Sequence, residues 1–119
     1  MQDKIFWNPD GYIEVVLVGD QTAQRFESMY ADFLPLQEKL KKEGKPAYAL
    51  FDCSKETGFS LSSNKAALEI LEKIEYDRIA MYSVPHANVT EGIIMAIGKN
   101  ETTKLFDTRE EALEWLLAK

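Results

Sequence analysis

The chain has 119 residues, of which 45% are hydrophobic and 29% are charged, and its net charge is −6. This length suits one domain with its own core, and the acidic balance disfavours nucleic acid as a partner because phosphate backbones repel negative surfaces. The single cysteine excludes an internal disulfide and the usual Cys/His zinc site. No segment has the apolar length of a signal peptide or membrane span, which predicts a cytoplasmic protein.

The apolar pattern predicts strands and helices that alternate along the chain. Two short runs rich in aromatic and β-branched residues flank the turn sequence NPDG, which predicts an N-terminal β-hairpin. Such alternation implies parallel pairing with right-handed crossovers. We therefore expect one α/β domain over residues 1–119, with a mostly parallel five-stranded sheet packed with about four helices. The expected strands are 4–7, 12–18, 46–53, 78–84 and 103–107, and the expected helices lie within 19–45, 62–74, 88–98 and 108–118.

Local signals mark the ends of two of these helices. Asp20 or Thr22 can cap the start of the first helix, and Gly44 ends it. Pro35 lies inside this helix and should kink or split it, because proline lacks an N–H group and clashes with the preceding turn. Thr108 predicts a capping box at the start of the last helix, together with the glutamate three residues later.

Residues suited to catalysis are few. His86 is the only histidine and Cys53 the only cysteine. Cys53 ends one predicted strand and His86 follows another, so both lie at the carboxyl ends of strands, where α/β proteins bind ligands. A small core residue and a solvated loop residue are the simpler interpretation of this pair. Asp52 could bind a metal or orient a ligand, or it could bond loop N–H groups to shape the connection. No glycine-rich phosphate motif occurs, and we expect no enzyme activity, cofactor or metal ion.

Serines gather before the second predicted helix. Ser60, Ser62 and Ser63 precede its apolar stripe, and one serine suffices as an N-cap. Helix geometry places Ser63 on the core-facing side and Ser62 roughly opposite. A phosphate on either residue would lie at a helix N-terminus, where N–H groups and the helix dipole favour a dianion.

The segment 88–98 is apolar on nearly all sides. Val89, Ile93, Ile94 and Ile97 supply this character, together with Met95. A helix of this kind is either buried on all sides or exposes an apolar face. Core burial, a small apolar ligand and a homodimer interface are all consistent with the pattern.

Three stretches of the chain read "YALFDCSKETGFSLSSNKAALEIL", "YDRIAMYSVP" and "KLFDTREEALEWL". They resemble the SpoIIAA-like family of small bacterial domains, which is related to the STAS anti-sigma factor antagonists and likened to CRAL-TRIO lipid carriers. The resemblance implies strands arranged roughly in sequence order. It also implies a non-enzymatic regulatory domain that binds a protein partner or, alternatively, carries a small lipophilic ligand near residues 89–97.

The resemblance further implies an interaction or switch loop. In anti-sigma factor antagonists, a serine within Asp-Ser-Ser-Gly begins this helix and is phosphorylated by a partner kinase. Here leucine replaces that aspartate at residue 61 and Asn64 replaces the glycine, so we expect Ser63 to be a cap or packing residue. The residues expected in the loop are Asp52, Ser54, Gly58, Ser60, Ser62, Ser63 and Asn64.

Overall fold

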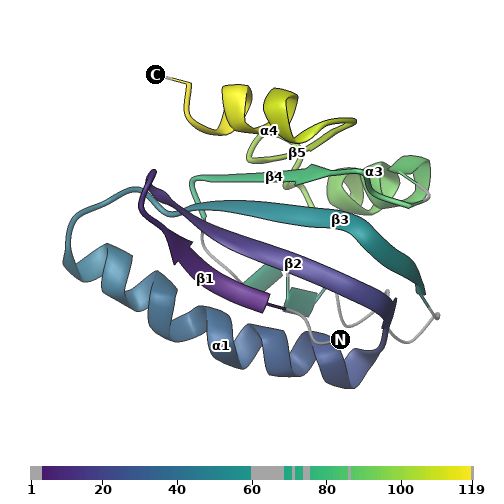
Figure 1. Ribbon diagram of the computed structural model, residues 1–119, viewed down its shortest axis with the longest axis horizontal. Helices are drawn as coiled ribbons and strands as arrows, with labels where there is room; N and C mark the ends of the chain where they lie inside the picture. Colours follow the sequence, from purple (N-terminus) through teal and green to yellow (C-terminus); the bar gives the residue numbers. More distant parts are fainter. Residues whose placement is uncertain (1–3, 60–68, 71, 74–75, 86, 119) are drawn as a thin grey trace.

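The structure, a computed structural model, describes residues 4–59, 69–70, 72–73, 76–85 and 87–118. Within these residues it contains five strands and three helices (Figure 1). The strands are β1 (Lys4–Asn8), β2 (Tyr12–Gln21), β3 (Tyr48–Phe59), β4 (Arg78–Tyr82) and β5 (Thr103–Phe106). The helices are α1 (Ala23–Lys42), α3 (Ala87–Ala96) and α4 (Arg109–Leu116).

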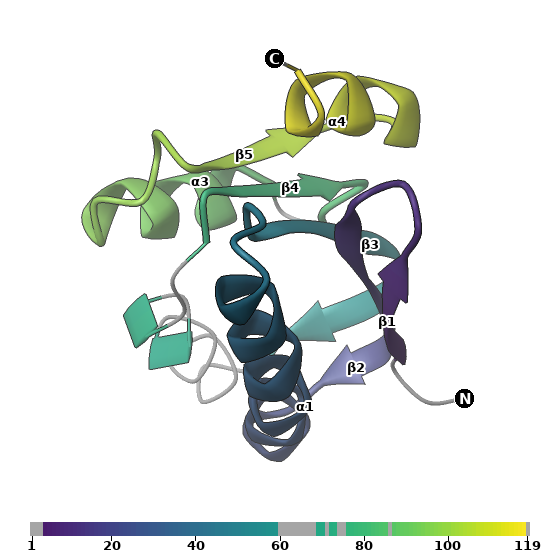
Figure 2. The same cartoon turned by 90° about the vertical axis from the view of Figure 1, so that its left-hand side faces the viewer.

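The five strands form one sheet in the order β1-β2-β3-β4-β5, which confirms the expected sheet and its sequence order. β1 pairs antiparallel with β2, and the other neighbours pair in parallel. α1 covers one face of the sheet and α4 covers the other (Figures 1 and 2). None of the helices in the described ranges is long and apolar enough to cross a membrane.

β2 and β3 are longer than the sequence pattern predicts. β3 was expected to end at Cys53 but continues to Phe59, and β2 continues to Gln21. β4 pairs with β3 only as far as Asp52, so the ends of β2 and β3 run on as a two-stranded extension. The register between them shifts after Val16 and again after Gly19. The stretch after Cys53 resembles a loop because it is polar, but backbone pairing with β2 makes it a strand.

α1 confirms one sequence prediction and excludes one of the two effects expected of Pro35. Thr22 is the N-cap, and its hydroxyl oxygen accepts a hydrogen bond from the Arg25 N–H at 3.2 Å. Pro35 does not split the helix, which runs without interruption from Ala23 to Lys42. The carbonyl one turn earlier, which loses its N–H partner, belongs to Ala31. That residue is exposed, so water can reach the carbonyl.

The predicted helix over 62–74 lies largely outside the described residues. Residues 69–70 and 72–73 are helical. The last helix begins as expected, because the Thr108 hydroxyl oxygen accepts a hydrogen bond from the Glu111 N–H at 3.2 Å.

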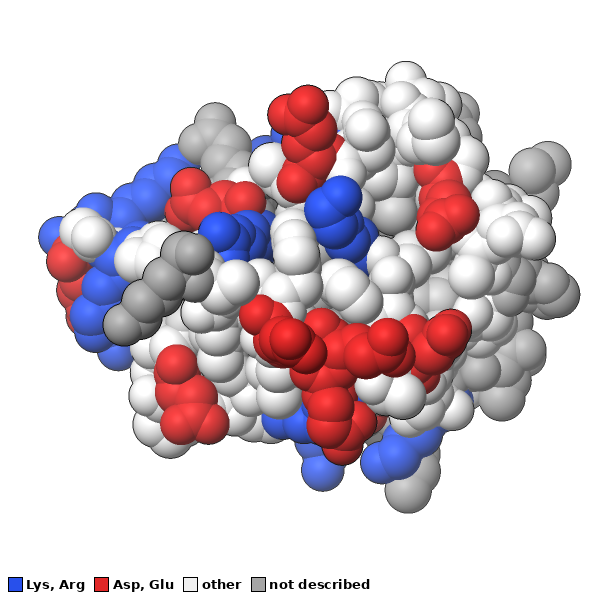
Figure 3. Space-filling view, turned by 90° about the horizontal axis from the view of Figure 1, so that it is seen from above, with Lys and Arg blue, Asp and Glu red and all other residues white. Residues whose placement is uncertain are grey.

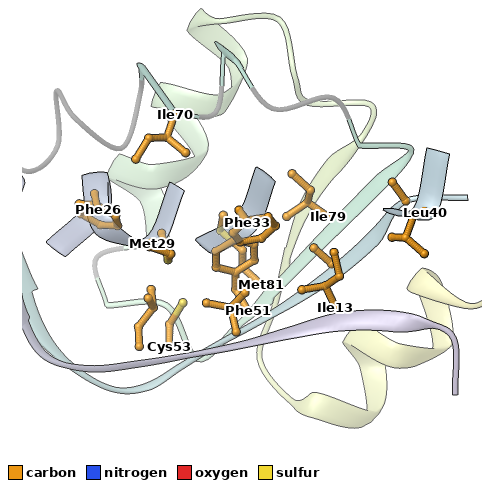
Figure 4. Close-up of a cluster of buried hydrophobic side chains, with 14 residues drawn as sticks. Ile13, Phe26, Met29, Phe33, Leu40, Phe51, Cys53, Ile70, Ile79 and Met81 are labelled. Carbon is orange, nitrogen blue, oxygen red and sulfur yellow. The ribbon is translucent and has the colours of Figure 1, made fainter. Parts of the chain in front are cut away.

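The larger hydrophobic core lies between the sheet and α1 (Figure 4). Phe33 is at its centre: its ring stacks on Phe51 at 5.8 Å between centroids and meets the Tyr76 ring edge-on at 5.2 Å. A smaller cluster on the opposite face packs α4 against β2, β3 and β4. Its buried members are Tyr12, Leu50, Ala80, Tyr82, Ala112 and Leu116.

Replacing Pro35 with alanine should raise the free energy of unfolding by about 1–2 kcal/mol. Proline inside a helix costs about 3 kcal/mol relative to alanine, and its stiffening of the unfolded chain offsets about 1 kcal/mol of that. Urea unfolding measures the difference. Glu38→Ala, also exposed on α1, is the matched control and should change stability by less than about 0.5 kcal/mol. An unchanged midpoint for Pro35→Ala would contradict the prediction.

Candidate functional site

Polar side chains gather on the α4 face of the sheet, from the start of β2 across the middle of β3 to the end of β4. Alternate residues of a strand point to the same face, so β2 directs Tyr12 and Glu14 toward α4. Asp52 of β3 and Tyr82 of β4 are register partners on this face.

Arg109, the first residue of α4, connects these side chains. One guanidinium nitrogen, Nη2, donates to the Glu14 carboxylate at 2.6 Å and to the Tyr12 hydroxyl at 3.1 Å. The other, Nη1, donates to the Tyr82 hydroxyl at 3.4 Å. The Glu14 side chain is only 11% exposed, whereas that of Arg109 is 37% exposed, so the carboxylate of this ion pair is largely shielded from water and the guanidinium is partly open to it. The Glu14 hydrogen bond is the main reason why the pKa of Arg109 is raised.

Asp52 extends the network toward the surface. One carboxylate oxygen, Oδ1, accepts hydrogen bonds from the Ser54 N–H at 2.9 Å and the Ser54 hydroxyl at 2.6 Å. The Tyr82 hydroxyl also bonds to Asp52. Desolvation raises the pKa of the Asp52 carboxyl, but these hydrogen bonds together outweigh it, so the pKa is lowered.

The two tyrosines keep their protons at neutral pH. Burial raises the pKa of Tyr12 and of Tyr82 above the ordinary phenol value, although Arg109 acts in the opposite direction. Both hydroxyls therefore serve as hydrogen-bonding groups between charged side chains. The arrangement fixes α4 to three strands and holds Asp52 ionised beside the exposed Ser54.

A second arginine holds the other end of α4. Arg78 Nη1 donates to the carbonyl oxygens of Trp115, Leu116 and Ala118 at 3.0, 3.3 and 2.6 Å. Trp115 and Leu116 belong to the last turn of α4, whose carbonyls have no N–H partner four residues further on within the helix, and the Trp115 carbonyl also accepts from the Ala118 N–H at 3.3 Å. The guanidinium also lies 5.5 Å from the Tyr48 ring centre and 5.7 Å from the Trp115 ring centre. α4 is thus anchored by an arginine at each end.

The structure changes the expected interaction loop. Asp52, Ser54 and Gly58 lie within β3 and not in a loop. The other residues expected there, Ser60, Ser62, Ser63 and Asn64, lie outside the described residues.

The two residues considered for catalysis are not brought together by any described contact. Cys53 is buried on the α1 face, opposite to Asp52, and His86 lies outside the described residues. Across the described ranges, no group of three or more His, Cys, Asp or Glu side chains is arranged to hold a metal ion.

The network partners of Asp52 are not among the residues that the sequence pattern marks as candidates. One usable signal was Glu14, a charged residue within the otherwise apolar run "YIEVVLV". Such a residue on a buried strand needs a partner. Nothing in the sequence pointed to Arg109 as that partner, because helix-surface arginines are common.

α3 is only partly buried. Val89 is 56% exposed and Met95 is 67% exposed. Ile93 and Ile97 are half-buried. Ile94 was expected on an apolar surface, but it is 2% exposed because it faces the sheet. α3 therefore combines one buried isoleucine with an exposed apolar surface.

The α4 side of the molecule is acidic. In the view from above, Asp and Glu side chains form a nearly continuous band across the middle of the face (Figure 3). On this side α4 carries exposed Glu110, Glu111 and Glu114. This charge disfavours anionic partners and favours a basic one.

The fold is SpoIIAA-like. A protein from Shewanella loihica PV-4, of the DUF3478 family and with a SpoIIAA-like fold, has a TM-score of 0.63 and 24% identity, covering 96% of this chain and 91% of that one. The anti-sigma factor antagonist SpoIIAA in its unphosphorylated form has a TM-score of 0.62 and 12% identity, covering 98% and 99%. The phosphorylated form of the Bacillus cell fate determinant SpoIIAA has a TM-score of 0.61 and 12% identity, covering 95% and 97%. No protein-family model and no curated protein matches the chain.

Replacing Asp52 with asparagine should reduce stability by about 1 kcal/mol at pH 7. Because the pKa of Asp52 is lowered in the folded state, its charged form contributes stability above the unfolded pKa of about 4, and this is lost as the pH falls through the folded pKa. The deficit of the variant should therefore shrink between pH 5 and pH 2. Urea unfolding across this range measures it.

Ser54→Ala provides a control for this prediction. It removes one donor to Asp52, so the pKa of Asp52 should move upward toward its ordinary value, as a carboxyl NMR titration would record. A deficit of Asp52→Asn that stays constant with pH would contradict the prediction.

Proposed function

We propose that this chain is a non-enzymatic regulatory domain that binds a protein partner through the end of β3 and the serine-rich segment after it, residues 58–64. The observation that carries the proposal is the likeness to SpoIIAA over nearly the whole of both chains, in the unphosphorylated and the phosphorylated form. SpoIIAA is an anti-sigma factor antagonist. Residues 60, 62 and 63 of this chain are serines, and they come directly after β3 in the sequence.

The polar network around Arg109 supports a role of this surface in presenting the serine segment to a partner. Asp52, Tyr82 and Arg109 hold one another by hydrogen bonds, so the strand that leads into the serine segment is fixed. A preorganised segment binds with less loss of conformational entropy than a free one. The donors of Arg109 and the Oδ1 atom of Asp52 are already engaged within the fold, which favours a structural role over proton transfer.

The acidic surface limits the kind of partner. The band of carboxylates on the α4 side (Figure 3) and the net charge of −6 favour a protein with a basic patch. Complementary surface charge accelerates association, and salt screens this effect. We therefore expect the complex to associate more slowly, and to bind less tightly, as ionic strength rises.

The test is affinity capture from a bacterial lysate with three versions of the protein. They are the wild type, Ser63→Asp, and Ser28→Asp as the matched control. Ser28 is exposed on α1, so the control makes the same chemical change outside residues 58–64. The captured proteins are quantified by mass spectrometry at low and high salt.

The proposal predicts one dominant partner that the wild type and Ser28→Asp retain and that Ser63→Asp loses. Loss of the partner at high salt would agree with the charge argument. Equal capture by all three proteins would reject the proposed surface, and capture of no specific protein by any of them would count against the function itself.

A second candidate function is binding of a small apolar molecule beside α3. The exposure of Val89 and Met95 favours it, since covering exposed apolar surface is favourable in free energy. Native mass spectrometry of the purified protein tests it. A bound mass that is released on denaturation would support it, bare monomer would weaken it, and a dimer would indicate self-association through α3.

A further inference from the structure

We propose that the hollow between α3 and β5 binds a small apolar carboxylic acid, with Thr103, Lys104 and Leu105 holding the carboxylate. The proposal rests on the second candidate function and adds the chemical class of its ligand. The site is separate from the network around Arg109. β5 pairs with β4 at one edge of the sheet, and Leu105 packs against the core on the α1 side.

The hollow has the size and the mixed lining of a small-molecule site. Its volume is about 360 Å³, within the range of roughly 300–1,000 Å³ that is common for ligand sites. One side is a face of α3, with Ile94 and Met95. The complete lining is Glu91, Ile94, Met95, Asn100, Thr103, Lys104 and Leu105.

Thr103 provides the observation that points to a polar ligand group. This residue lines the hollow and is only 3% exposed. Its hydroxyl oxygen has no hydrogen-bond partner among the described residues. A buried hydroxyl without a partner is unfavourable, because it has lost its bonds to water. A ligand oxygen in the hollow would supply the missing acceptor.

The free edge of β5 adds a second donor. The Ile79 N–H bonds to the Thr102 carbonyl at 2.7 Å and the Ser83 N–H bonds to the Phe106 carbonyl at 3.1 Å. In a parallel pair, alternate residues of a strand bond to the same neighbour. The backbone of Leu105 therefore points away from β4, and no other strand in the described part of the chain pairs with this edge.

Together these groups fit an anion with an apolar tail. The Thr103 hydroxyl and the Leu105 N–H are two donors of one strand. The Lys104 side chain leaves β5 on the opposite face, so its exposed ammonium reaches the carboxylate around the free edge of the strand, and charge-assisted bonds to a carboxylate are the stronger kind. Glu91 lies on the α3 side and repels an anion there. The carboxylate should therefore lie at β5, and the tail should lie along Ile94 and Met95.

The experiment uses hexanoate, hexanol and hexylamine as probes of equal chain length. Each is titrated into ¹⁵N-labelled protein while the backbone amide signals are followed by NMR. We expect hexanoate alone to give saturable shifts centred on residues 94–95 and 103–105. Thr103→Val and Lys104→Gln should each weaken its affinity about tenfold.

The variants and probes separate the ways in which the proposal can fail. The Thr103 hydroxyl has no partner to lose, so Thr103→Val should melt at the same temperature as the wild type or higher. Unchanged hexanoate affinity in that folded variant would overturn the proposal. Equal binding of all three probes would also overturn it while leaving the apolar-ligand function intact. Absence of saturable shifts with every probe would reject both.

Discussion

Replacing Phe33 with alanine should lower the free energy of unfolding by about 4 kcal/mol. Phe33 is 1% exposed, and its ring contacts Phe51 of β3 and Tyr76 before β4. The substitution therefore removes buried apolar surface, leaves a cavity between α1 and the sheet, and breaks two aromatic contacts. Small domains are stable by only about 5–15 kcal/mol, so this is a large part of the total.

Two further substitutions calibrate the Phe33 prediction. Phe33→Leu keeps most of the volume and should cost about 1.5 kcal/mol. Phe6→Ala makes the same truncation on β1, where the side chain is 41% exposed, and should cost less than about 1 kcal/mol. Urea unfolding followed by fluorescence and circular dichroism measures all three. A cost of Phe33→Ala similar to that of Phe6→Ala would show that the core does not depend on this ring.

Replacing Arg109 with methionine should lower the free energy of unfolding by about 3 kcal/mol. The change leaves the Glu14 carboxylate, 11% exposed, without its partner at 2.6 Å. It also removes donors to two tyrosine hydroxyls. An unpaired buried charge is the main cost, and the methionine side chain keeps most of the apolar packing.

A double-mutant cycle isolates this ion pair. Glu14→Leu removes the other charge, and the combination with Arg109→Met should cost about 2 kcal/mol less than the sum of the two single changes. The exposed pair of Lys45 and Glu43, at 3.1 Å with side chains 56% and 40% exposed, is the control. Its disruption should cost less than about 1 kcal/mol. Additive effects of Glu14→Leu and Arg109→Met would show that the two residues do not stabilise each other.

The order of elements could be predicted from the sequence because it depends on local patterns. "YALF" and "RIAMY" have apolar residues on both faces, as strands in the middle of a sheet require. Thr108 shows its capping role through its spacing to Glu111. The family resemblance added the sequence order of the strands, which the sheet confirms.

The long ends of β2 and β3 could not be predicted in the same way. Residues 54–57 read "SKET", which is typical of a loop. They form a strand because their backbone pairs with β2, whose residues lie far away in the sequence. Side-chain patterns carry little information about such pairing. The Arg109–Glu14 contact has the same origin, since 95 residues separate its partners.

The sequence order of the strands has a consequence for how the chain folds during synthesis. Each strand can pair with its predecessor as soon as it leaves the ribosome, so most contacts of the sheet form early. Arg109 emerges last and closes onto β2, the strand that emerged near the beginning. Opening should follow the reverse order, with amide hydrogens of β5 and α4 exchanging before those of β2 and β3. Simultaneous exchange in all four elements would show instead that the fold, once closed by Arg109, opens as a single cooperative unit.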